Sequence, residues 1–124
     1  MTRIRAAGLP CLVAAGFILG ACARSERNEL VVSGGDAARG RAALIALDCG
    51  ACHRIPGIPG ARGTVGPPLD SFRQRVYIAG RHPNVPDRLV AWIRDAPSLD
   101  PGTAMPDLDV SESEARDIAA YLYR

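Results

Sequence analysis

The spacing of apolar and polar positions along the 124 residues predicts three helices. The first covers residues 36–48, where Asp36 can cap the helix and apolar side chains gather near its end. The second covers residues 85–95 and follows Asn84, another capping residue. The third begins at the capping-box pattern of residues 111–114, after which apolar residues recur at helical spacing. No segment alternates in the manner of a strand, so the pattern predicts an all-α protein.

Glycine and proline mark the segments between these helices. Residues 55–68 are rich in both, which excludes regular structure and predicts a stiff loop. Pro97 is expected to stop the second helix. Residues 23–34 are mostly polar and run into a Ser-Gly-Gly sequence, which predicts a flexible tether ahead of the first helix.

The N-terminal residues have the pattern of an export signal. Two arginines precede an apolar run at residues 11–21, which is shorter than the roughly 20 residues of a membrane span. The run ends in Leu-Gly-Ala-Cys, which is similar to the lipobox of bacterial lipoproteins, whose cysteine is acylated. An ordinary secretory signal or an uncleaved anchor helix at residues 6–23 is the alternative. The predicted organisation is a signal peptide at 1–21, a lipidated Cys22 with a flexible tether at 22–35, and one domain at 36–124.

The distribution of charge excludes one class of function. All 15 strongly basic residues are arginines. Residues 23–94 hold eleven arginines and six acids, whereas residues 95–124 hold two arginines and seven acids. The domain lacks the basic surface that nucleic-acid binding requires, so no nucleic-acid partner is expected. The acidic C-terminal part is either a solvated face or a docking surface for a basic partner.

Cys49, Cys52 and His53 form a C-x-x-C-H sequence, which is typical of a c-type haem attachment site. Two thiols at this spacing can add to the vinyl groups of one porphyrin, and the histidine that follows can bind its iron. A thioredoxin-like pair would need a preceding strand, and a zinc site would need more ligands than His53 and His82 provide. Of the other two cysteines, Cys11 would leave with the signal peptide and Cys22 would be acylated, so no disulfide is expected. The motif therefore predicts one covalent haem c.

Met105 is the candidate for a second iron ligand. It is the methionine that remains once the export signal is removed, and it lies in the segment 101–106, where two prolines make the loop rigid. A thioether on such a loop can bind haem iron; otherwise Met105 is a core residue. His82 is the rival ligand, but its turn-like segment predicts an exposed loop histidine.

These motifs resemble those of the class I cytochromes c over nearly all of the predicted domain. The resemblance implies an all-α cytochrome c fold, with three to five helices around one covalently bound haem. It implies that the Pro67 carbonyl accepts a hydrogen bond from His53, which would fix the tautomer of the imidazole. It further implies that Arg75 contacts a haem propionate, and that Gly40 and Tyr121 lie where the terminal helices cross.

Two further segments are similar to those of the cytochromes c associated with bacterial haem–copper oxidases. They begin at Tyr77 and Leu89 and flank Asn84. In that group Trp92 would lie near the haem propionates, with Tyr77 and Asn84 near the haem edge. The alternative for Trp92 is an ordinary core anchor, because both interpretations bury its ring.

The resemblance implies an electron carrier rather than an enzyme, and the lipobox-like sequence predicts that it is lipid-anchored on the periplasmic side of a bacterial membrane. One electron would pass through a haem with two iron ligands, from a quinol–cytochrome c oxidoreductase or a dehydrogenase to a terminal oxidase. The alternatives are a haem enzyme or gas sensor with an open sixth site, and a fixed haem subunit of an oxidase or dehydrogenase complex. Because the domain is small and poor in aromatic residues, we expect it to be largely unfolded without haem.

Overall fold

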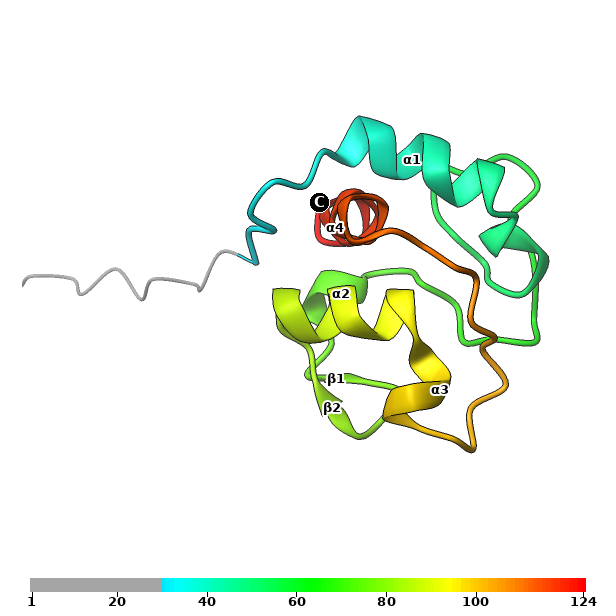
Figure 1. The fold of residues 1–124 in the computed structure, drawn as a ribbon. Helices are drawn as coiled ribbons and strands as arrows, with labels where there is room; N and C mark the ends of the chain where they lie inside the picture. Colours follow the sequence, from blue (N-terminus) through cyan, green and yellow to red (C-terminus); the bar gives the residue numbers. More distant parts are fainter. Residues whose placement is uncertain (1–29) are drawn as a thin grey trace, which may run out of the picture.

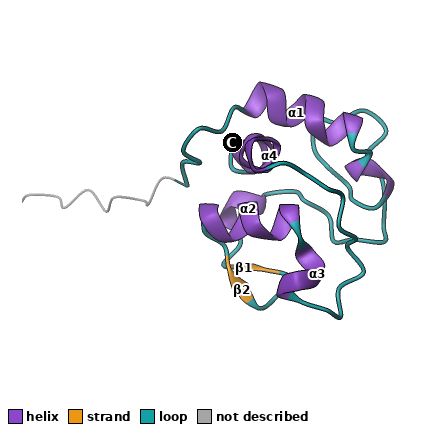
Figure 2. Ribbon diagram, in the orientation of Figure 1, coloured by secondary structure: helices purple, strands orange, loops and turns teal. Residues whose placement is uncertain are grey.

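The computed structural model describes residues 30–124, which form four α-helices, two 3₁₀ turns and one small hairpin (Figure 1 and Figure 2). In chain order these are α1 (Ala37–Ala46), η1 (Cys49–Ala51), η2 (Phe72–Gln74), β1 (Tyr77–Ile78), β2 (His82–Pro83), α2 (Pro86–Arg94), α3 (Ala96–Leu99) and α4 (Glu112–Leu122). The mostly helical architecture confirms the predicted fold class. The expected signal peptide and Cys22 lie outside the described residues.

Helices α1 and α4 pack directly against each other (Figure 1). Asp36 caps α1, and residues 111–114 form the capping box of α4, both as predicted. At the crossing, a Cβ added to Gly40 would overlap the carbonyl oxygen of Asp117. The two helices can approach this closely because position 40 has no side chain, as the resemblance implied.

A buried carboxylate joins these two helices. Asp117 on α4 is only 6% exposed and accepts a hydrogen bond from the backbone N–H of Asp36 at 2.7 Å. The Arg39 guanidinium donates two more to it, each at 2.8 Å. The hydrogen bond from Arg39 is the main reason that the pKa of Asp117 lies below its usual value. The contact therefore depends on an ionised Asp117.

The apolar core lies between α4 and α2. Helix α2 buries Leu89, Val90, Trp92 and Ile93. Helix α4 buries Ala115, Ile118, Ala119 and Tyr121 alongside Asp117. These side chains belong to one continuous cluster that also includes Leu44 of α1, so three helices from distant parts of the sequence share a single core.

The start of α2 differs from the prediction. Val85, not Asn84, is the N-cap, and it makes no side-chain capping bond. Asn84 is instead buried, and its amide nitrogen donates to the carbonyl oxygens of Phe72 and Arg75 at 2.9 and 3.0 Å. Asn84 therefore satisfies two buried backbone carbonyls instead of capping the helix.

The end of α2 also differs from the prediction. The helix stops at Arg94, before Pro97 is reached. The Asp95 carboxylate accepts a hydrogen bond from the backbone N–H of Ser98 at 3.0 Å and so caps the short helix α3. Pro97 lies in the first turn of α3, where a missing N–H removes no helical hydrogen bond. The proline therefore begins a short helix instead of ending the longer one.

The hairpin of β1 and β2 departs from the predicted absence of strands. The two strands pair in antiparallel fashion. Ala79 and Gly80 form the turn with φ values of 49° and 72°, and the Arg81 N–H donates to the Ile78 carbonyl at 3.1 Å. Each strand has two residues, which is too short for an alternating pattern to be visible in the sequence.

Two residues ahead of Asp36, the predicted start of the domain, contact the rest of the structure. Val32 is 6% exposed and belongs to the core cluster. Gly35 lies so close to α4 that an added Cβ would contact the carbonyl oxygen of Arg116. Val32 and Gly35 therefore pack against the domain, whereas Ser33 and Gly34 between them are exposed. None of the helices within residues 30–124 has the length and apolar character to cross a bilayer.

Candidate functional site

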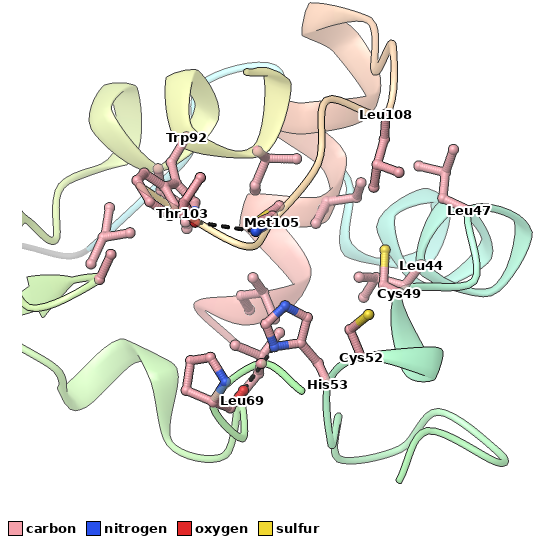
Figure 3. Close-up of a pocket in the computed structure, with 18 of the residues that line it drawn as sticks. Leu44, Leu47, Cys49, Cys52, His53, Leu69, Trp92, Thr103, Met105 and Leu108 are labelled. Atoms are coloured by element: carbon pink, nitrogen blue, oxygen red, sulfur yellow. Dashed lines mark hydrogen bonds between the residues drawn. The ribbon is translucent and has the colours of Figure 1, made fainter. Parts of the chain in front are cut away.

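A cavity of about 290 Å³ lies between α1, α2, α4 and the loop that precedes α4 (Figure 3). Its wall is mainly apolar and includes Leu44, Leu47, Phe72, Leu89, Ile93 and Ile118. The wall also contains seven residues that the sequence singled out: Cys49, Cys52, His53, Pro67, Arg75, Trp92 and Met105. The fold thus brings together side chains that are up to 56 positions apart in the chain.

Cys49 and Cys52 lie together at one end of the cavity (Figure 3). Asp48, with a φ of 50°, turns the chain out of α1 and into η1. The N–H groups of Cys52 and His53 both donate to the Cys49 carbonyl, at 3.4 and 3.0 Å, which makes the segment a compact turn. Both thiols are free and partly buried, and burial raises the pKa of the Cys49 thiol. The turn therefore presents two thiols to the same apolar space.

The His53 imidazole is held by contacts on two sides. Its Nδ1 lies 2.8 Å from the carbonyl oxygen of Pro67, so that Nδ1 donates and Nε2 is left free to bind a metal. This is the contact that the resemblance implied. A Cβ added to the neighbouring Gly66 would overlap the imidazole ring. Because Gly66 has no side chain, there is room for the imidazole ring beside it.

Met105 faces His53 across the cavity (Figure 3). It lies in the irregular segment between α3 and α4. The N–H of Thr103 donates to the Asp100 carbonyl at 2.9 Å, and the Thr103 hydroxyl accepts a hydrogen bond from the Met105 N–H at 3.2 Å. These local bonds hold the backbone that carries Met105 in the cavity wall.

Arg75 and Trp92 also line the cavity. The Arg75 guanidinium carbon lies 5.1 Å from the centre of the Phe72 ring, and Nη2 donates to the carbonyl oxygen of Pro68. Trp92 is 8% exposed and belongs to the core cluster. The structure therefore agrees with both interpretations of Trp92, a core anchor and a residue of the site wall.

Tyr77 and Asn84 do not contribute to the cavity wall, in contrast to what the resemblance implied. Tyr77 is 54% exposed on β1. Asn84 is buried away from the cavity, where its Oδ1 accepts a hydrogen bond from the Tyr123 hydroxyl at 2.7 Å. Burial raises the pKa of Tyr123 to about 12, so this hydroxyl remains a donor at neutral pH. Asn84 holds the end of α4 against η2 instead of facing a ligand.

Comparison with known proteins agrees with this geometry. A family model described as cytochrome c matches residues 37–123. The chain belongs to the cytochrome c family. A curated relative, the cytochrome c oxidase subunit 2 of Alkalihalophilus pseudofirmus, is 39% identical over 86 residues. The match covers 68% of this chain but only 24% of the relative, so the cytochrome spans about a quarter of that protein's length.

The residues of this cytochrome fit the haem that its family binds. Cys49 and Cys52 are free thiols at one end of a mainly apolar cavity, which suits two thioether bonds to one porphyrin. His53 has one ring nitrogen occupied by Pro67 and the other available for iron. The chain therefore carries a covalently bound c-type haem and functions in haem-based electron transfer.

The sequence does not predict two residues that position the backbone of the site in this cytochrome, Thr103 and Gly63. The sequence places Thr103 in the rigid segment 101–106 but does not predict that its hydroxyl accepts a hydrogen bond from the Met105 N–H. Gly63 is also required, because a Cβ there would overlap the backbone of Cys52. The glycine itself is the signal that could have revealed this contact, since glycine is common where two backbones meet.

Proposed function

We propose that this cytochrome c is a lipid-anchored one-electron carrier on the periplasmic side of a bacterial membrane, with iron bound by His53 and Met105. One observation carries the ligand assignment: His53 and Met105 line one mainly apolar cavity, which two free thiols also line. Histidine and methionine ligands are typical of haem groups that transfer electrons.

The residues of the cavity have separate tasks in this proposal. Haem supplies a reversible one-electron couple between ferric and ferrous iron. The Pro67 carbonyl holds the Nδ1 proton of His53, which keeps Nε2 unprotonated and strengthens it as a donor. The apolar side chains keep water away from the iron, which favours its less charged ferrous state. If His53 and Met105 both bind the iron, no position is left on it for a substrate, so no bond-making chemistry is expected.

The proposed acceptor is a terminal oxidase, and the proposed donor is a quinol–cytochrome c oxidoreductase or a dehydrogenase. The similarity to a cytochrome c oxidase subunit 2 supports the link to an oxidase. An acyl group on Cys22 would keep the domain near such membrane complexes and raise its effective concentration there. Replacing Cys22 by Ser should move the haem-containing protein from the membrane fraction to the soluble fraction; retention in the membrane would contradict the anchor.

Binding of carbon monoxide tests the assignment of Met105. The reduced wild-type protein should not bind this gas promptly at neutral pH, because the sixth position is filled. Met105→Ala should bind it promptly, as followed by the visible spectrum. Leu108→Ala is the matched control, since Leu108 lines the same cavity but has no ligand atom. Prompt binding by the wild type would favour the alternative, a haem enzyme or gas sensor with an open site.

A fixed haem subunit of an oxidase or dehydrogenase complex is the second alternative. It is favoured by the relative's being an oxidase subunit that is about four times as long as the matched region. Purification from the native membrane separates the two cases. A carrier should elute as a small monomer after its lipid is removed, whereas a fixed subunit should remain with the larger complex under mild detergent.

A further inference from the structure

The hairpin region carries a group of exposed apolar side chains. Val76 and Tyr77 are 71% and 54% exposed, and Val85 is 46% exposed. Tyr77 is the register partner of Pro83. The Asn84 N–H donates to the Val76 carbonyl at 3.0 Å, so the two segments lie side by side at the open end of the hairpin. Val76, Tyr77, Pro83 and Val85 are called the hairpin patch below.

The hairpin patch is the place where exposed apolar residues gather within residues 30–124. The other large apolar side chains exposed there are Val31, Ile45 and Val65, which lie in three separate parts of the chain. Single exposed apolar residues are common, whereas a cluster of them marks an interaction surface. Figure 1 shows the hairpin at the edge of the molecule, with α2 between it and α4.

Positive charge accompanies the hairpin patch. Residues 71–89 contain four arginines and one acid. Arg88 lies one helical turn after Val85. Arg73 lies in η2, which Asn84 joins to the hairpin through hydrogen bonds to two backbone carbonyls. Within the described part of the chain, neither of these two arginines forms an ion pair.

Two carboxylates reduce the positive charge at other points of this region. Oδ2 of Asp100 lies 3.6 Å from Nη1 of Arg81, so the turn end of the hairpin is close to neutral. Asp87 precedes Arg88 in the first turn of α2, where the helix N-terminus balances part of its charge. The positive charge is therefore greatest at the open end of the hairpin, beside the exposed apolar side chains.

The start of the described chain adjoins the same end of α4 as the hairpin patch. A Cβ on Gly35 would lie 2.9 Å from the side chain of Ala120, near the end of α4. One turn further on, the Tyr123 hydroxyl donates to Asn84 at 2.7 Å. Eight positions separate Cys22 from residue 30, and at full extension they reach about 28 Å. An acyl group on Cys22 would therefore keep the hairpin patch within reach of the bilayer.

We propose that the hairpin patch, together with Arg73 and Arg88, rests on the anionic phospholipid headgroups of the membrane that holds the lipid anchor. This inference rests on the anchor in the proposed function and adds a second contact with the bilayer. It assigns the domain an orientation, with the hairpin toward the membrane and α1 away from it (Figure 1).

An anionic membrane surface suits both features of this face. Tyrosine is enriched where a bilayer meets water, with its ring at the level of the headgroups. Arginine is attracted to anionic lipid, and its alkyl stem covers apolar surface while the charge stays in water. A redox partner would instead have to approach the haem cavity, which none of the four residues of the hairpin patch lines. The chemistry of this face therefore favours lipid over a redox partner.

The contact is weak by itself and acts together with the anchor. A small apolar patch and two arginines give little affinity, but an anchored domain has a high effective concentration beside the bilayer. Without the anchor, binding should require lipid at millimolar concentration and should be lost in high salt. The expected release of Cys22→Ser into the soluble fraction is therefore unchanged.

Vesicle binding by the haem-containing Cys22→Ser protein measures this contact without the anchor. At millimolar lipid and low salt, the protein should sediment with phosphatidylglycerol vesicles and stay in solution with phosphatidylcholine vesicles. High salt should release it from the anionic vesicles. Failure to sediment with the anionic vesicles, or equal sedimentation with both kinds, would overturn the proposal.

Substitutions of exposed residues locate the contact. In the Cys22→Ser protein, Val76→Ser with Tyr77→Ser should weaken binding to anionic vesicles about tenfold, because two apolar side chains leave the interface. Arg88→Gln should weaken it about fivefold through the loss of one charge. Ile45→Ser and Arg41→Gln are the matched controls on α1 and should bind as the parent does. Equal binding by the patch variants and the controls would contradict the assignment.

Spin-labelled headgroups give a readout that needs no substitution in the hairpin patch. In the reduced, nitrogen-15-labelled Cys22→Ser protein, anionic nanodiscs carrying such lipids should broaden the amide signal of Tyr77 and leave that of Ile45 sharp. Broadening at Ile45 without broadening at Tyr77 would place the membrane on α1 and overturn the proposal.

The outcomes separate this inference from the lipid anchor. If the Cys22→Ser protein ignores anionic vesicles while the wild type remains in the membrane fraction, the hairpin patch fails and the anchor stands. If the wild type is soluble while the hairpin patch still binds anionic vesicles, the anchor fails and the surface contact stands. Neither result changes the carbon monoxide test of the iron ligands.

Discussion

The α1–α4 pair and the methionine loop, residues 100–110, are held by different kinds of contact. The helices meet through the backbone at Gly40 and through the ion pair of Arg39 with buried Asp117, two contacts between residues about 80 positions apart. In the methionine loop, the backbone N–H groups that have partners donate to residues two to four positions away. Long-range hydrogen bonds fix the helix pair, whereas only local ones shape the loop.

This difference indicates which part of the fold the polypeptide determines alone. The contacts between α1 and α4 described above are made entirely by protein groups, so none of them involves a ligand directly. The methionine loop touches the rest of the molecule mainly through side chains such as Met105 and Leu108, which face the cavity. Its position should therefore depend on what fills the cavity, and haem binding and folding should be coupled.

The largest effect is expected from removing both attachment thiols. Cys49→Ala with Cys52→Ala should abolish covalent haem and leave a mainly apolar cavity inside a domain of about 90 residues, so that most helix content is lost. Circular dichroism and the mass of the purified protein measure both effects. Cys22→Ser removes a cysteine outside the domain and should leave the covalent haem and the helix content unchanged, although its mass also loses the proposed acyl group. Native-like helix content in the double variant would show that the polypeptide folds alone.

A smaller but still large effect is expected at the helix crossing. Helix propensity alone predicts that Gly40→Ala stabilises the protein by about 1 kcal/mol. The overlap of the new Cβ with the Asp117 carbonyl predicts the opposite sign, a loss of about 3 kcal/mol, because backbone cannot move aside cheaply. Chemical denaturation gives the sign. Gly102→Ala is the control, since its Cβ would meet only the Asp100 carboxylate at 3.5 Å.

The ion pair in the same contact should have a smaller, pH-dependent effect. The Arg39 hydrogen bond lowers the pKa of Asp117 in the folded state, so its stabilisation is present above the unfolded pKa and is lost as pH falls through the folded pKa. Asp117→Asn should lower the Tm at pH 7 by about 4–8 °C and reduce the loss of stability in acid. Equal Tm values for wild type and variant at pH 7 would contradict this role.

The same comparison explains what the sequence could predict. Helix ranges, the capping residues Asp36 and Ser111 and the haem-binding motif are local features, and each can be recognised within a few residues. The long-range contacts are not visible in this way. Asp117 is an ordinary polar residue in the pattern of α4, and only the fold shows that it meets Arg39.

The polar residues of the hairpin region were the hardest to predict. Asn84 suits a helix cap, and nothing in its neighbourhood indicates that Phe72 and Tyr123 will reach it. His82 lies in a sequence typical of a turn, yet its Nε2 is buried behind Trp92. In both cases tertiary packing overrides the local preference, and the side chain then takes on a role that spacing cannot show.

The smallest effect is expected in the methionine loop itself. Thr103→Val removes the hydroxyl that accepts the Met105 N–H and keeps the shape of the side chain. Losing one such bond, worth roughly 1 kcal/mol, should speed hydrogen exchange at the Met105 amide about fivefold. Exchange in α1 and α4 should not change, because no hydrogen bond of theirs involves the loop. Thr103→Ser keeps the hydroxyl and should behave as wild type. If exchange rose equally in the helices, loop and helix pair would form one cooperative unit, and the contrast between them would fail.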